Sequence, residues 1–118
     1  MAQGFAYDET DNLAGENVKN YSSSNSAVVP SSETTLVTHT ATKDEIIKYV
    51  YGNGETDGRF KLYVNSTAIW IGRNAWTERN IKDQIEKRII SGDIVELKVT
   101  NLKLTNHLFG GGFTIYEL

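Results

Sequence analysis

Hydrophobic and polar residues alternate along most of the chain after residue 33, and this alternation predicts β-strands. It is clearest over residues 94–100, where Val95, Leu97 and Val99 are separated by charged or polar residues. Successive side chains of a strand point to opposite faces, so a half-buried strand has this period of two. Further strands are predicted at residues 34–40, 45–51, 60–64, 68–73 and 113–118. Short strands separated by turns predict an all-β fold, an antiparallel sandwich or barrel.

Three segments carry further signals of turns, of a helix or of a bend in the chain. Residues 60–64 and 68–73 flank a short polar turn and form the best candidate hairpin in the chain. In residues 81–90 isoleucines recur four positions apart, which favours one short helix, although an isoleucine-rich segment also suits a strand at a sheet edge. Residues 110–112 are three consecutive glycines, which we expect to form a flexible or bent connection before the final strand.

The first 32 residues have a different character from the rest. They hold four acids and one base, whereas residues 33–118 hold eleven of each. Their apolar density is too low to offset the cost of ordering the backbone, so we expect an extended N-terminal arm over residues 1–32 and a sandwich domain over residues 33–118. The arm is either a mobile terminus or a segment that orders on a partner. In the second case its anchors are the spaced apolar residues Phe5, Tyr7, Leu13, Val18 and Tyr21.

The sequence contains no recognisable catalytic or metal-binding motif. There is no cysteine, and the two histidines, His39 and His107, lack the helical spacing of zinc hydrolases. The glycine-rich loop at residues 52–58 has oxygen-bearing side chains at alternate positions but does not fit the ligand pattern of an EF-hand. Residues 110–112 lack the lysine and the helix of a phosphate-binding loop. We therefore expect a protein that is not an enzyme, with no catalytic residues, no metal and no cofactor.

Composition narrows the classes of partner. The sequence pI of about 5.3 argues against nucleic acid. The longest apolar runs are four residues, far short of the roughly 20 that a membrane-spanning helix needs, so no membrane partner is expected. The N-terminus has neither the basic nor the apolar region of a signal peptide, so we expect no secretion.

Trp76, Arg73 and Arg79 are the candidate partner-binding residues of the body. Trp76 lies among polar residues, and it either packs on the body or contacts a partner. The two arginines belong to a group of five bases with three acids among them over residues 73–88. This group is either a solvated face of mixed charge or the receiver of the acidic arm of a neighbouring subunit. Trp70, within an apolar run, is expected in the core.

The chain resembles the small β-sandwich structural proteins of tailed-bacteriophage virions. The residues that carry the resemblance are the Ser/Thr-rich lead-in at 30–37, the hairpin at 60–67 and the turn and strand at 91–99. The resemblance implies a jelly-roll-like sandwich with an extended arm and at most one short helix. It also implies a non-catalytic role in capsid decoration or in the neck, collar or tail. The partners it implies are other virion proteins or copies of the chain itself, assembled as an oligomer through the arm.

The resemblance further implies that the chain is made in the host cytoplasm and located in the virion. The alternative is a glycan-binding β-sandwich module, whose site would combine Trp76, Tyr49 and Tyr51 with the loop at residues 52–58. A virion protein can also contact host glycans, so the two functions are compatible.

Overall fold

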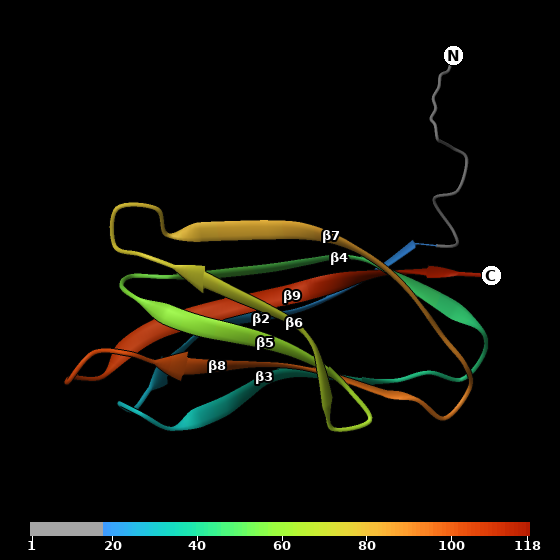
Figure 1. The fold of residues 1–118 in the computed structure, drawn as a ribbon, viewed down its shortest axis with the longest axis horizontal. Helices are drawn as coiled ribbons and strands as arrows, with labels where there is room; N and C mark the ends of the chain where they lie inside the picture. The colour runs from blue at the N-terminus through green and yellow to red at the C-terminus, as the bar shows by residue number, and fades with distance from the viewer. Residues whose placement is uncertain (1–17) are drawn as a thin grey trace, which may run out of the picture.

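The computed structural model describes residues 18–118, with residues 24 and 25 described by their backbone only. These residues form eight strands in two antiparallel sheets packed face to face (Figure 1). The first sheet has the order β2 (Val18–Val28), β9 (His107–Glu117), β4 (Glu45–Gly54) and β7 (Asn80–Ile89). The second has the order β3 (Glu33–Thr40), β8 (Ile94–Asn101), β5 (Gly58–Val64) and β6 (Thr67–Asn74). The antiparallel β-sandwich is thereby confirmed.

The strand pairing is that of a jelly roll. β5 pairs with β6, β4 with β7, β3 with β8 and β2 with β9, so the chain forms one long hairpin that is rolled into two sheets. The centre of this hairpin is the β5–β6 turn. The sequence predicted this hairpin, and the structure confirms it.

The core lies between the inward faces of the two sheets. The central strands β5, β8, β4 and β9 provide most of it, because their alternate residues point inward. The core residues are Val28, Ala41, Ile47, Val50, Phe60, Leu62, Val64, Ile89, Val95, Leu97, Val99, Phe109, Phe113 and Ile115. Phe60 and Phe109 meet edge to face from opposite sheets, with ring centroids 6.2 Å apart.

The helix favoured at residues 81–90 is wrong, because β7 (Asn80–Ile89) occupies this segment. Isoleucines four apart share a face in a strand as well as in a helix, so pairing with β4 decides the conformation. A bulge lies in this pair, and Glu86 takes a positive φ of 58° within β7. None of residues 18–118 forms a helix long and apolar enough to cross a membrane.

Within the described residues the sandwich includes β2, which begins at Val18, so it extends beyond the predicted boundary at residue 32. β2 pairs with β9 from Val18 opposite Tyr116 to Val28 opposite His107. The low apolar density of this segment is offset by backbone pairing and by the burial of Val28. Residues 1–17 lie outside the described residues.

The glycines at residues 110–112 lie within β9 and do not form a connection before it. A Cβ on Gly112 would clash with the Tyr21 carbonyl oxygen and would lie 2.6 Å from the Tyr51 hydroxyl. The absence of a side chain at Gly112 therefore lets β2 and the Tyr51 side chain approach β9 closely.

Candidate functional site

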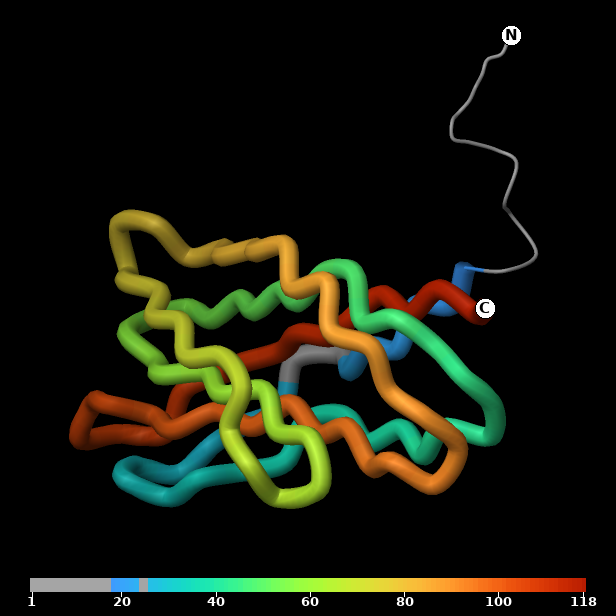
Figure 2. Tube along the Cα trace, turned by 45° about the vertical axis from the view of Figure 1, so that its right-hand side comes forward, coloured from blue at the N-terminus to red at the C-terminus, as the bar shows by residue number. Residues whose placement is uncertain are grey.

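Four connections meet at one end of the sandwich, and we call this the loop end. It comprises residues 29–32, 55–57, 75–79 and 102–106, which lie together on the left in both views (Figures 1 and 2). Loops presented by a rigid sandwich commonly carry binding residues. The opposite end carries the connections at residues 41–44, 65–66 and 90–93.

Asn74 fixes two of these loops from inside. Its side chain is only 2% exposed and lies at the end of β6, opposite Gly58 of β5. The Oδ1 atom accepts the Gly58 N–H at 2.8 Å, and Nδ2 donates to the carbonyls of Arg79 and Gly54 at 3.1 and 3.4 Å. Asn74 therefore joins the loop at residues 55–57 to the turn at residues 75–79.

Asn101 does the same for the other two loops. It is fully buried at the end of β8, also opposite Gly58. Its Nδ2 donates to the carbonyls of Val28 and Thr105, each at 2.9 Å, while Oδ1 accepts the Lys103 N–H at 2.8 Å. Because a buried carboxamide left without partners is costly, these bonds hold the loops in one arrangement.

Asp57 connects three loops of the loop end. Its Oδ1 accepts the backbone N–H of Trp76 at 3.2 Å, and its carbonyl accepts the backbone N–H of Leu102 at 3.2 Å. The Nζ of Lys103 lies 3.6 Å from Oδ2. The network formed by Asp57, Asn74 and Asn101 makes the loop end a braced surface.

Trp76 is presented to solvent at the tip of one braced turn. Its side chain is 63% exposed. Ala75 and Glu78 exchange two backbone hydrogen bonds at 3.0 and 3.1 Å across the turn, and Arg79 Nε donates to the Trp76 carbonyl at 3.3 Å. The backbone of Trp76 is thus fixed on both sides while its indole ring stays free of the core.

Other large apolar side chains are exposed at the loop end or next to it. Leu104 is 94% exposed, Val29 is 49% exposed and Leu108 is 44% exposed. With Trp76, these are half of the eight large hydrophobic side chains that are exposed within residues 18–118. A concentration of exposed apolar side chains of this kind is typical of a binding surface.

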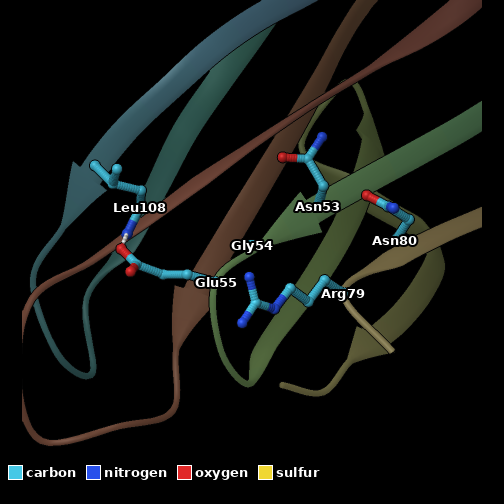
Figure 3. A pocket seen from close by; sticks show the side chains of 6 residues that line it. All are labelled: Asn53, Gly54, Glu55, Arg79, Asn80 and Leu108. Atoms are coloured by element: carbon cyan, nitrogen blue, oxygen red, sulfur yellow. Dashed lines mark hydrogen bonds between the residues drawn. The ribbon is translucent and has the colours of Figure 1, made fainter. Parts of the chain in front are cut away.

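Three shallow hollows surround Asn80, the first residue of β7. The first, of about 240 Å³, lies at the loop end between Glu55, Arg79 and Leu108. Figure 3 shows the Arg79 side chain reaching toward the β4–β5 loop, while Glu55 points away from it and accepts the Leu108 N–H at 2.5 Å. The second hollow, of about 410 Å³, is lined by Tyr51, Gly52, Asn53, Asn80, Ile81 and Lys82. The third, of about 290 Å³, is lined by Gly72, Arg73, Glu78, Asn80, Ile81, Lys82 and Asp83.

The structure brings together only some of the predicted partner-binding residues. Trp76 and Arg79 lie on the same turn, and Arg73 lies next to it at the end of β6. Val18 lies at the opposite end of the sandwich, paired with Tyr116. Phe5, Tyr7 and Leu13 lie outside the described residues.

Tyr21, a predicted anchor on a partner, contacts its own sandwich. Its ring stacks on His39 with centroids 4.2 Å apart and tilts against Phe113 at 5.8 Å. Burial, aided by the nearby carboxylates of Glu45 and Glu117, raises the pKa of Tyr21 above its usual value. Tyr21 is therefore a residue that attaches β2 to the core.

Trp70 is half-buried against the core and lies at the edge between the two sheets. Its Nε1 donates to Asp83 Oδ2 of β7 at 2.8 Å. The sequence predicted a core position for Trp70, and its ring does pack against the core. The hydrogen bond to Asp83 was not predicted. Sequence reasoning also missed Asp57, Asn74 and Asn101, although an asparagine at the end of an alternating strand is a recognisable signal for a side chain that bonds loop backbone.

Within residues 18–118 no group of three or more histidine, aspartate or glutamate side chains is arranged to hold a metal ion.

No protein-family model matches the chain, and no curated protein matches it. Among solved structures, the insecticidal delta-endotoxin Cry8Ea1 from Bacillus thuringiensis aligns with a TM-score of 0.49 at 10% sequence identity. The alignment covers 80% of this chain and 19% of the toxin chain, so this chain spans well under two thirds of that protein's length.

Proposed function

We propose that this protein is a non-catalytic structural subunit of a tailed-bacteriophage virion, present in multiple copies as a capsid decoration or as part of the neck, collar or tail. The observation that carries the proposal is Trp76, an exposed tryptophan on a turn that hydrogen bonds fix on both sides. Tryptophan and arginine are enriched among the residues that dominate binding energy at protein interfaces. The loop end therefore docks on a neighbouring virion protein.

The bracing of the turn bears directly on affinity. Binding is weakened by the cost of immobilising loops and side chains at an interface. The loops of the loop end are already ordered in the free protein, because Asn74, Asn101 and Asp57 hydrogen-bond to their backbones. Binding therefore loses less conformational entropy there. Leu104 and Val29 add exposed apolar area at the same end.

Purified particles of the phage that encodes this chain provide the test. Mass spectrometry of the particles should detect the chain at many copies per particle. Trp76→Ala should lower incorporation by about 30-fold, the equivalent of ~2 kcal/mol for the loss of a dominant interface residue. Ile90→Ala is the matched control, because Ile90 is 58% exposed at the opposite end of the sandwich. Particles that lack the wild-type chain, or that incorporate both variants equally, would contradict the proposal.

A second candidate function is glycan binding, and the hollow beside Tyr51 favours it. Asn53 and Asn80 face each other in register across β4 and β7 and line this hollow of about 410 Å³ together with Tyr51. Neither carboxamide hydrogen-bonds to another residue of the described chain, so both donors and acceptors are available to sugar hydroxyls. The site differs from the predicted one: Trp76 lines none of the three hollows, and the Tyr49 ring is covered by Lys82 Nζ at 4.8 Å.

Isothermal titration with a panel of neutral oligosaccharides tests this candidate. A binding sugar should lose most of its affinity in the double variant Asn53→Ala with Asn80→Ala. Asn106→Ala, at an exposed position of the loop end, is the control. Equal affinity for all variants, or no binding across the panel, would remove glycan binding from consideration.

A further inference from the structure

The outward face of the second sheet carries four cations that lie opposite one another. Arg59 of β5 is in register with Arg73 of β6, and Lys61 of β5 is in register with Lys98 of β8. Inward residues of the same strands, such as Phe60 and Leu62, are buried, which places all four cations on the outer side. We call Arg59, Lys61, Arg73 and Lys98 the basic face.

The cations of the basic face are not paired directly with carboxylates of the described residues. Lys98 Nζ lies 5.0 Å from the centroid of the Tyr63 ring, which leaves its charge in place. Four acids border the face: Glu33 accepts the Tyr63 hydroxyl at 2.7 Å, and Glu96 is in register with Tyr63. Glu78 and Asp83 line a hollow together with Arg73, without forming an ion pair with it.

Like charges directly opposite each other in an antiparallel pair destabilise a sheet. A negatively charged partner on this face would relieve the repulsion within both pairs. Ile71, in register with Lys61, is 60% exposed on the same face and offers an apolar contact to that partner. The partner should therefore combine acidic residues with apolar ones.

The chain itself contains a segment with this chemistry. Residues 1–17 carry four acids, Asp8, Glu9, Asp11 and Glu16, and no base. Phe5, Tyr7 and Leu13 are interspersed with these acids. Fully extended, the 17 residues could span about 56 Å at about 3.3 Å per residue, which exceeds the 48 Å length of the described body. The segment is therefore long enough to reach across a neighbouring copy.

The position of β2 favours a second copy over the same molecule. Val18 lies at the end of the sandwich that is opposite the loop end, on the edge strand of the first sheet. Arg59 and Arg73 lie near the loop end of the second sheet, next to Gly58 and Asn74. A segment of the same chain would have to change sheets and run back along the molecule to reach these arginines.

We infer that the basic face formed by Arg59, Lys61, Arg73 and Lys98 binds the acidic segment 1–17 of a second copy of this chain. The inference rests on the proposed function, which supplies neighbouring copies. It also revises the receiver suggested by the sequence: Arg73 belongs to the second sheet, while Lys82 and Lys87 lie on β7 of the first.

Carbodiimide cross-linking of the full-length protein tests the inference. An equal mixture of unlabelled and ¹⁵N-labelled protein is cross-linked at low salt, and the products are mapped by mass spectrometry. We expect links from the four carboxylates of residues 1–17 to Lys61 and Lys98 that join labelled to unlabelled chains. The links should disappear at about 1 M salt, where the screening length is only about 3 Å. Lys82 and Lys87, exposed amines on β7, are internal controls that should remain unlinked.

Charge variants sharpen the test. Arg59→Glu with Arg73→Glu should reduce the cross-links between copies at least about tenfold, and adding Asp8→Lys with Asp11→Lys should restore association through reversed charge. The matched control is Lys82→Glu with Lys87→Glu, which should have no effect. Trp76→Ala should also leave the links unchanged, so failure of the virion proposal and failure of this inference can be told apart.

Several results would overturn the inference. Links confined to single chains would assign the basic face to the chain's own segment. Links that are absent, or equally frequent at Lys82 and Lys87, would remove the specific contact. Binding of single-stranded DNA that depends on Arg59 and Arg73, without links between copies, would assign the face to nucleic acid.

Discussion

The carboxylate of Asp57 accepts the backbone N–H of Trp76 at 3.2 Å, although the two residues are 19 positions apart in different loops. The carbonyl of the same aspartate accepts the backbone N–H of Leu102 at 3.2 Å. Side chain and backbone of one residue thus hold two different loops. Removal of the side chain therefore removes the bond to Trp76 and the ion pair with Lys103, and it leaves the backbone bond to Leu102 in place.

Asp57→Ala should free the Trp76 amide without freeing that of Leu102. The substitution removes the carboxylate and keeps the carbonyl, so we expect faster hydrogen exchange at Trp76 and unchanged exchange at Leu102. The lost bond is exposed, and its removal should lower the free energy of unfolding by about 1 kcal/mol or less. Residue-resolved hydrogen exchange and urea denaturation check both statements. Unchanged exchange at Trp76 would show that the turn at residues 75–79 holds its own shape.

The two tryptophans should differ sharply in their contribution to stability. Trp76→Ala should change the free energy of unfolding by less than about 0.5 kcal/mol, because most of the indole is in solvent. Trp70→Ala should lower it by about 3 kcal/mol, because its ring packs on the core and its Nε1 bonds Asp83. Denaturant unfolding of both variants provides the comparison. A loss of several kcal/mol in the Trp76 variant would place that ring in a stabilising contact.

The sequence predicted the sandwich and its central hairpin because strand pattern and turn chemistry agree over residues 60–73. It misassigned residues 81–90 because isoleucines four apart satisfy both a helix and a strand, and the deciding contact with β4 is distant in the sequence. It placed residues 18–28 in the arm because its local composition cannot reveal pairing with β9, about 90 positions later. The polar surroundings of Trp76 in the sequence agree with its exposure in the structure. The asparagines that brace the loop end depend on contacts that the pattern does not contain.

Asp93 should contribute to stability in a pH-dependent way. The backbone N–H of Ile90 and the side chain of Asn65, each at 2.9 Å, lower the pKa of the Asp93 carboxyl below its usual value. The folded state thus favours the ionised form, so this stabilisation is present above the unfolded pKa near 4 and is lost as the pH falls through the folded pKa. Asp93→Asn should therefore reduce the drop in melting temperature between about pH 4 and pH 2. An identical acid profile in both proteins would contradict this role.

Two truncations should behave differently, because β2 (Val18–Val28) is part of the sandwich. Removal of residues 1–17 leaves all eight described strands intact, so the cooperative unfolding transition should be retained. Removal of residues 1–28 also deletes β2, and with it the buried Val28 and the Tyr21 ring that packs on Phe113.

The longer truncation leaves the backbone of β9 without a partner on one side and exposes part of the core. Loss of a fully buried valine alone removes roughly 1.5–3 kcal/mol of burial. The free energy of unfolding should therefore fall by several kcal/mol, an appreciable part of the 5–15 kcal/mol typical of small domains. Circular dichroism during urea denaturation measures both transitions. If the protein without residues 1–28 were as stable as the protein without residues 1–17, β2 would be an attached arm and not a strand that the sandwich requires.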